Sequence, residues 1–255
     1  MTRVIGIDIG GTGIKGAIVD VDAGTVLSDR IKYPTPEGGE PEAITATVTR
    51  IVTELEGTGD EPIGVCFPAI VRGGRTMSAA NVSENWIGLD ADALFSAALG
   101  RNIHFVNDAD AAGYAEASYG AARNQAGLVI MTTLGTGIGS ALLYDGVLIP
   151  NSELGHLEIG GVEAEDWTAN STRERENLSF SHWAERLTQY YRHVEFLFSP
   201  ELFVIGGGIS KRFEEFATLI EVETPIVPAA LRNNAGIMGA AALAARYTHA
   251  PGRNL

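Results

Sequence analysis

The chain opens on an alternating pattern of apolar positions that is typical of a β-strand. Ile5, Ile7 and Ile9 are two residues apart, with smaller or polar residues between them, which is the period of a strand that buries one face. A glycine-rich stretch, residues 10–13, follows, and residues 14–21 are again largely apolar. The pattern predicts two strands joined by a glycine turn.

The rest of the chain alternates between short apolar runs and longer segments with helical spacing. Residues 63–67 form an apolar run that Pro68 ends, which predicts a buried strand, and an alanine-rich stretch after Asp108 predicts a helix, because alanine is the best helix former. The other predicted strands are 103–106, 128–133, 138–144 and 202–205, and the predicted helices are 42–55, 109–122, 180–197, 211–220 and 236–245.

A four-residue motif occurs twice. The sequence GTGI at residues 11–14 recurs at residues 135–138, and each copy stands between two apolar segments. Two related halves, each opening with a β-hairpin whose turn is rich in glycine, would face each other across a cleft. Chance similarity between two short glycine turns is the alternative.

Composition and charge narrow the class of protein. The 255 residues are 45% hydrophobic and 20% charged, which is ordinary for a soluble globular protein of one large or two modest domains. The formal net charge of −14 argues against general binding to nucleic acids or acidic membranes. A single cysteine, Cys66, excludes a disulfide framework and a cysteine-based zinc cluster. Neither a signal peptide nor a membrane span of about 20 apolar residues occurs, so we expect a cytoplasmic location.

The first glycine turn has the residue types of a phosphate-binding loop. Residues 11–16 match the pattern G-x-G-x-x-G, but a strand is expected after the turn where a dinucleotide-binding loop has a helix. Successive N–H groups of a glycine turn can still point at an anion, while Thr12 adds a hydroxyl and Lys15 a cation. Asp8 ends the first predicted strand, where a carboxylate can hold Mg²⁺ directly or through water.

Asn107-Asp108 marks the point where a predicted strand gives way to a predicted helix. Asp108 can simply cap that helix. The alternative is a general base, kept ionised by the helix dipole, that accepts the proton of a sugar hydroxyl as the hydroxyl attacks phosphorus.

Glu153 and His156 are three residues apart. On one turn of chain they can converge on the hydroxyl groups of a ligand, because a carboxylate accepts hydroxyl protons and a neutral imidazole both donates and accepts. A surface pair without function is the alternative.

Six segments occur in an order that resembles a known family. They resemble the ROK family of sugar kinases, in the actin-like ATPase superfamily, and more closely its actinobacterial polyphosphate glucokinase branch. The resemblance covers nearly the whole chain. The segments are 7–16 (IDIGGTGIKG), 78–82 (SAANV), 107–113 (NDADAAG), 133–139 (TLGTGIG), 153–159 (ELGHLEI) and 204–212 (VIGGGISKR).

The resemblance implies roles for individual residues. Asp108 is expected to be the catalytic base, and Asp8 the partner of Mg²⁺. The expected ligands of the sugar hydroxyls are Asn81, Asn107, Glu153, His156 and Glu165. The expected phosphate-binding residues are Gly10, Gly11, Thr12, Gly13 and Lys15, then Gly135, Thr136 and Gly137, and finally Gly207, Gly208, Lys211 and Arg212.

The resemblance also implies an α/β fold of the two-domain actin-like ATPase (ribonuclease H-like) type with an interdomain cleft. We expect residues 1–106, completed by the C-terminal helix region 236–255, to form one domain and residues 107–235 the other, in a homodimer. Most of the family has a cysteine-rich zinc motif shortly after the histidine. Residues 160–169 contain no cysteine, so no structural zinc is expected.

Lys211 and Arg212 are expected in the first turn of the predicted helix 211–220, where the helix dipole disfavours cations. A local conflict of this kind often marks a functional site. We interpret the two cations as ligands for the distant phosphates of polyphosphate, the alternative being that Glu214 and Glu215 neutralise them on the surface.

The sequence thus predicts a glucokinase that transfers a phosphoryl group from polyphosphate and/or ATP to the 6-hydroxyl of glucose. The alternative enzyme is a strictly ATP-dependent hexose kinase for glucose or mannose. The alternative from another class is a sugar-sensing ROK-like regulator without catalysis. A DNA-binding regulator needs a segment ahead of the first strand, and the expected strand residues begin at Val4. We therefore expect no nucleic-acid or membrane partner.

Overall fold

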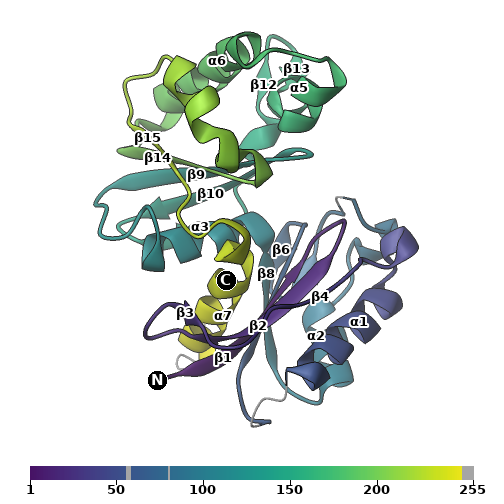
Figure 1. The fold of residues 1–255 in the computed structure, drawn as a ribbon. Helices are drawn as coiled ribbons and strands as arrows, with labels where there is room; N and C mark the ends of the chain where they lie inside the picture. Colours follow the sequence, from purple (N-terminus) through teal and green to yellow (C-terminus); the bar gives the residue numbers. More distant parts are fainter. Residues whose placement is uncertain (56–58, 80, 249–255) are drawn as a thin grey trace. The chain divides into compact units, whose positions relative to one another are not determined.

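The structure is a computed structural model that describes residues 1–55, 59–79 and 81–248 (Figure 1). The chain forms two compact units, Met1–Ala115 together with the segment from Asn234 onward, and Glu116–Asn233. The division predicted from the sequence placed the boundaries at 106/107 and 235/236. Residues 249–255 of the predicted C-terminal region lie outside the described residues.

The first unit is built on a mixed sheet. The opening hairpin is antiparallel, with Ile9 opposite Ile14, and the strands that follow β1 on its other side are parallel to it. In order across the sheet the strands are β3 (Thr25–Val26), β2 (Ile14–Asp20), β1 (Arg3–Ile9), β5 (Ile63–Phe67) and β8 (Ile103–Asn107), with β4 (Ile31–Tyr33) also paired to β2.

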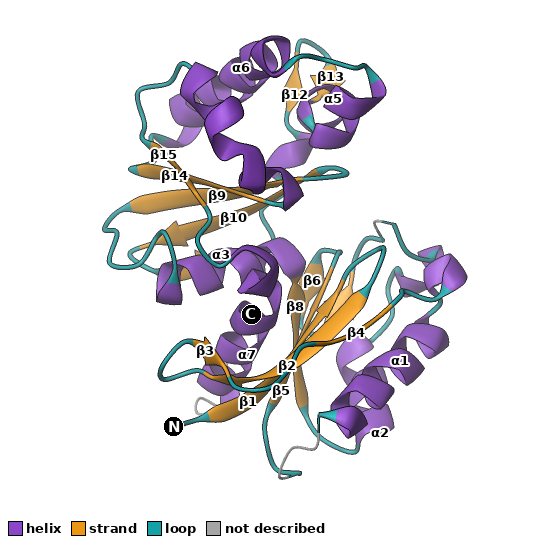
Figure 2. Cartoon of the chain, viewed as in Figure 1, coloured by secondary structure: helices purple, strands orange, loops and turns teal. Residues whose placement is uncertain are grey.

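Helices cover both faces of this sheet. On one side lie α1 (Pro41–Glu54) and α2 (Ala91–Leu99), and on the other lies α7 (Ala235–Thr248) (Figures 1 and 2). In α1 the buried residues Ile44, Val48 and Ile51 recur at helical spacing, so one face of the helix joins the core with the isoleucines of β1.

Glycines let α7 approach the sheet at backbone distance. A Cβ on Gly64 in β5 would lie 2.0 Å from the carbonyl oxygen of Ala240, and one on Gly6 in β1 would lie 2.1 Å from that of Ile237. Ordinary contacts of this kind stand at 3.4–4 Å. The C-terminal helix therefore packs on β1 and β5 only because these strand positions lack side chains.

The second unit repeats the strand arrangement of the first. Its opening hairpin is antiparallel with Leu134 opposite Ile138, and β14 and β15 continue the sheet in parallel. This arrangement confirms the predicted repeat as a repeated supersecondary structure. Across the sheet the order is β11 (Val147–Ile149), β10 (Ile138–Tyr144), β9 (Leu128–Leu134), β14 (Leu202–Gly206) and β15 (Ile226–Pro228).

The long helix α6 (Phe180–Phe198) supplies the core of the second unit. Its buried residues include Trp183, Leu187, Tyr191 and Val194, which pack with residues of β9 and β14. The remaining elements of the unit that position site residues are η3 (Leu154–His156), β12 (Glu158–Ile159), β13 (Val162–Glu163), α4 (Ala164–Thr168) and α5 (Asn170–Arg175).

One predicted element is wrong. The segment expected as a helix over 211–220 is a tightly wound 3₁₀ stretch, Gly208–Glu215, with a non-helical residue at Arg212 and a second short turn at Ala217–Leu219. Phe216 is buried in the core although the segment is not an α-helix. Tertiary packing therefore overrides the local helical preference.

The other predicted strands and helices are confirmed, with bounds shifted by a few residues at most. The α3 helix spans Asp108–Tyr119. Within the described parts of the chain, no helix is both long and apolar enough to cross a bilayer.

Candidate functional site

The first glycine turn is an open loop at the end of the β1–β2 hairpin. The N–H of Gly10 donates to the carbonyl of Gly13 at 3.1 Å, and the hydroxyl of Thr35 donates to the carbonyl of Gly10 at 2.5 Å. Gly11 and Thr12 are exposed. A Cβ on Gly11 would lie 3.0 Å from the Cβ of Asn81, so this predicted sugar ligand lies against the turn.

Asp8 and Lys15 are paired with each other. They are opposite in the β1–β2 register, and Lys15 Nζ lies 2.7 Å from Asp8 Oδ2, with both side chains largely buried. Lys15, which is predicted to bind phosphate, therefore forms an ion pair with Asp8, which is predicted to bind Mg²⁺. The contact of Lys15 is with Oδ2 of Asp8, and one carboxylate with waters and substrate phosphates is a usual Mg²⁺ environment. Asp8 thus fits the expected role.

Lys32 is a residue that the sequence interpretation missed at this turn. It is the register partner of Lys15 on β4. A Cβ on Gly13 would lie 2.9 Å from Lys32 Cε and 3.7 Å from Nζ. The chain has few lysines, which was the available signal, but the short strand that carries Lys32 was not predicted.

Asn107, and not Asp108, caps α3. The side-chain oxygen of Asn107 accepts the N–H of Asp110 at 2.9 Å, and its Nδ2 donates to the carbonyl of Ala69 at 3.0 Å. Asn107 is 7% exposed. Asp108 Oδ1 accepts the N–H of Ala109 at 2.8 Å. The capping hydrogen bond that the sequence offered to Asp108 is therefore made by Asn107.

Asp8 and Asp108 share a neighbour in Cys66. Burial raises the pKa of the Cys66 thiol well above its ordinary value, and the carboxylates of Asp8 and Asp108 add to the rise. The thiol is buried, as predicted, and un-ionised at neutral pH, so it is a small apolar group between two acidic residues of the first unit.

The second glycine turn is braced by α5. The carbonyl of Gly135 accepts the N–H of Ser171 at 3.0 Å, and that of Thr136 accepts the Ser171 hydroxyl at 2.5 Å. A Cβ on Gly135 would meet nothing within 4 Å, whereas one on Gly137 would lie 2.4 Å from Glu165 Oε2. The turn is thus open at Gly135 and covered by Glu165 at Gly137.

Glu153, His156 and Glu165 converge in the second unit. Glu153 precedes the single turn η3, and His156 ends it. Glu165 Oε2 accepts the N–H of Ile138 at 3.1 Å, and its Oε1 lies 3.9 Å from His156 Nδ1. Burial raises the pKa of the Glu153 carboxyl, Glu165 adds to the rise, and His156 opposes it. The three side chains are thus close enough to influence one another electrostatically.

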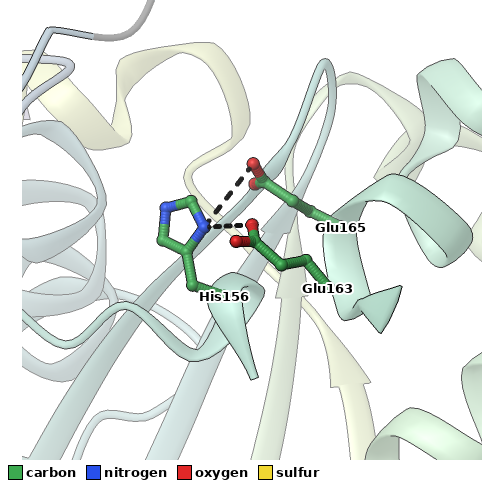
Figure 3. Close-up of side chains that lie close together, drawn as sticks. All are labelled: His156, Glu163 and Glu165. Atoms are coloured by element: carbon green, nitrogen blue, oxygen red, sulfur yellow. Dashed lines mark hydrogen bonds and ion pairs between the residues drawn. The ribbon is translucent and has the colours of Figure 1, made fainter. Parts of the chain in front are cut away.

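Glu163 joins this cluster and was missed from the sequence. Figure 3 shows its carboxylate facing the imidazole ring, with Oε2 at 2.7 Å from His156 Nδ1. This hydrogen bond is the main reason that the pKa of His156 is raised. Nitrogen and oxygen atoms of His156, Glu163 and Glu165 that could bind a metal ion lie within 4.8 Å of one another. The contact of 2.7 Å between His156 and Glu163 is a direct hydrogen bond, which needs no metal ion between the two groups.

Lys211 and Arg212, which follow the last glycine turn, have different surroundings. Gly207 has φ 83°, a conformation that favours glycine, and Gly208 begins the 3₁₀ stretch. Arg212 makes two contacts with Glu215, at 2.6 and 2.7 Å, and its guanidinium lies 4.4 Å from the ring centroid of Phe180. Lys211 is exposed. Neither cation lies in the first turn of an α-helix, so the dipole argument for them no longer applies.

The predicted site residues therefore form two groups. The first unit holds the first glycine turn and, besides it, Asp8, Lys15, Asn81, Asn107 and Asp108. The second unit holds Glu153, His156, Glu165 and the two later glycine turns, with Lys211 and Arg212.

Comparisons with known proteins agree on one family. A model of the ROK family matches residues 4–172. The chain is 47% identical over 246 residues to a polyphosphate glucokinase of Mycobacterium tuberculosis (strain CDC 1551 / Oshkosh), covering 96% of this chain and 92% of that protein. It is 46% identical over 249 residues to the polyphosphate glucokinase of Mycobacterium leprae (strain TN), covering 97% and 76%.

A solved structure agrees with these relatives. The inorganic polyphosphate/ATP-glucomannokinase of Arthrobacter sp. strain KM superposes with a TM-score of 0.93 at 51% identity, covering 96% of this chain and 99% of that one.

Proposed function

The chain belongs to the ROK family and has its two-domain actin-like ATPase fold, and from that premise we propose that it is a glucokinase using polyphosphate and ATP. It transfers the terminal phosphoryl group of the donor to the 6-hydroxyl of glucose. The observation that carries this conclusion is the identity of 47% to a polyphosphate glucokinase over 96% of the chain.

In the second unit, the polar cluster offers ligands for glucose, and in the first unit Asn81 and Asn107 are the proposed glucose ligands. Glu153, His156 and Glu165 offer carboxylate acceptors and an imidazole within one short segment, which suits neighbouring hydroxyl groups of a sugar. The raised pKa of Glu153 reflects partial burial, and a half-buried carboxylate is stabilised by a ligand that donates hydrogen bonds to it. Asn107 is already bound to backbone groups through both its amide nitrogen and its oxygen, so its proposed contact uses remaining capacity.

Asp108 accepts the proton of the attacking hydroxyl. It is the first residue of α3, where the positive end of the helix dipole favours the ionised carboxylate. Asn107 provides the cap of this helix, and we assign the proton transfer to the carboxylate of Asp108.

The glycine turns bind the donor phosphates through backbone N–H groups, aided by Thr12, Thr136 and the cations near them. When bound at Asp8, Mg²⁺ shares the charge of the phosphates. Lys15 holds the Asp8 carboxylate in a fixed position at 2.7 Å. We add Lys32 to the phosphate-binding cations because its amine lies beside Gly13.

The test is a steady-state assay of glucose 6-phosphate formation with Mg²⁺ and either ATP or polyphosphate, with mannose as a second acceptor. We expect product from glucose with both donors. Activity with ATP alone would make the protein a strictly ATP-dependent hexose kinase. Glucose binding without any product would make it a sugar-binding regulator.

Loss of the Glu153 or His156 side-chain groups is expected to affect the sugar and not the donor. Glu153→Gln and His156→Ala should each raise the KM for glucose by about 10–100-fold, because a hydrogen bond to a charged group contributes about 1.5–3 kcal/mol. The KM for ATP should change little. Steady-state kinetics at saturating co-substrate measures both. A changed donor KM with an unchanged glucose KM would contradict the assignment.

Lys211 and Arg212 are expected to differ in their importance for the donor. Lys211→Ala should lower kcat/KM for polyphosphate about fivefold, the size of one exposed charge interaction of about 1 kcal/mol, and should flatten its salt dependence. Arg212→Ala should have a smaller effect, because Glu215 already neutralises this guanidinium.

The matched measurement for these two variants is kcat/KM for ATP over the same range of salt. Equal losses for ATP and polyphosphate in the Lys211 variant would remove this residue from the polyphosphate site.

A further inference from the structure

Glu163 lies in a short hairpin that presents it to His156. The strands β12 and β13 pair Glu158 with Glu163. Both glutamates are exposed. The carboxylate of Glu163 contacts the imidazole ring, with Oε2 at 2.7 Å from Nδ1 of His156 (Figure 3). The hairpin leads directly into α4, which carries Glu165. The geometry of the hairpin therefore sets where the acceptor for His156 stands.

This contact decides the state of the imidazole ring. An ionised carboxylate only accepts hydrogen bonds, so Nδ1 carries the proton in both the neutral and the charged form of His156. In the neutral form Nε2 is then an acceptor, and in the charged form it is a donor. The carboxylates that face the ring are Glu163, Glu165 and Glu153, and the hydrogen bond to Glu163 is the strongest influence on its pKa.

We propose that Glu163 is a positioning residue for glucose binding: it fixes the rotation and tautomer of His156 so that Nε2 meets a sugar hydroxyl in a defined state. The proposal rests on the proposed function, in which His156 is a sugar ligand. Glu163 itself need not touch the sugar. Its role is exerted through Nδ1, as the orienting partner of a histidine commonly is.

The first experiment reads the ring directly and does not depend on catalysis. In ¹⁵N-histidine-labelled protein, the His156 resonances are assigned by their loss in His156→Ala. We expect the neutral ring of the parent to be protonated at Nδ1. Glu163→Ala should shift it toward the Nε2-protonated tautomer and lower its pKa. Glu163→Gln removes the charge, so it should lower the pKa; because its amide can accept from or donate to Nδ1, it no longer enforces one tautomer.

The second experiment connects the ring to the sugar. Glu163→Ala should raise the KM for glucose about tenfold, the scale of one hydrogen bond to a charged group, and leave the KM for ATP unchanged. The limb of the pH profile of kcat/KM for glucose that reports His156 should move to lower pH. Glu158→Ala is the matched control, because it removes the same group from the opposite position of the hairpin.

The outcomes separate this proposal from the proposed function. A parent enzyme without glucokinase activity would overturn the proposed function. An active parent in which Glu163→Ala leaves the tautomer, the pKa and the KM for glucose of the parent unchanged would overturn the positioning role. Equal effects of Glu158→Ala and Glu163→Ala would also overturn it, because the hairpin and not the contact would then be responsible.

Discussion

Replacing Asp108 with asparagine is expected to lower the turnover of glucose phosphorylation by about 10²–10⁴-fold, the usual effect of losing a general base. Asparagine keeps the shape and can still accept the N–H of Ala109, so the local fold should persist. It cannot accept the hydroxyl proton. Glucose affinity, measured by isothermal titration, should be nearly that of the parent.

The control for Asp108→Asn is Glu42→Gln, which removes an exposed acid from the first turn of another helix in the same unit. That change loses a similar dipole interaction, about 0.3–1 kcal/mol, without touching the site. Near-normal turnover in a folded Asp108→Asn protein would refute the base assignment.

Adding one methyl group at Gly64 is expected to disrupt the first unit. In Gly64→Ala the new Cβ would stand 2.0 Å from the carbonyl oxygen of Ala240, and both partners are backbone, so no side chain can move aside. We expect a loss of about 3–5 kcal/mol in the free energy of unfolding, at or above the upper end for overpacking. Urea denaturation followed by circular dichroism measures it, and low soluble yield is an accompanying sign.

Gly135→Ala is the matched substitution in an open position. Nothing lies within 4 Å of its Cβ, so stability should change by about 1 kcal/mol or less, while kcat/KM for the phosphate donor should fall because the backbone can no longer approach the anion closely. Equal stability for both variants would mean that α7 does not pack on β5 as described.

Most of the strands and helices could be predicted from the sequence because their apolar residues repeat at the period of a strand or a helix. The isoleucines of β1 alternate, the buried face of α1 repeats at helical spacing, and the glycine turns stand between apolar runs. Each of these signals lies within one element and its neighbours. The segment 211–220 failed because its helical period was satisfied by burying Phe216 in an irregular stretch, which no local pattern encodes.

By itself, the sequence determined the duplicated hairpins and the order of the motifs, and from that order we propose the residues for phosphoryl transfer. Tertiary structure decided which of those residues are paired with one another. The register of β1 and β2 brings Lys15 into contact with Asp8. Asn107, and not Asp108, makes the capping hydrogen bond of α3. The short hairpin of β12 and β13 brings Glu163 to His156. Propensity and periodicity act over a few residues of chain, whereas these partnerships depend on distances between atoms that only folding brings together.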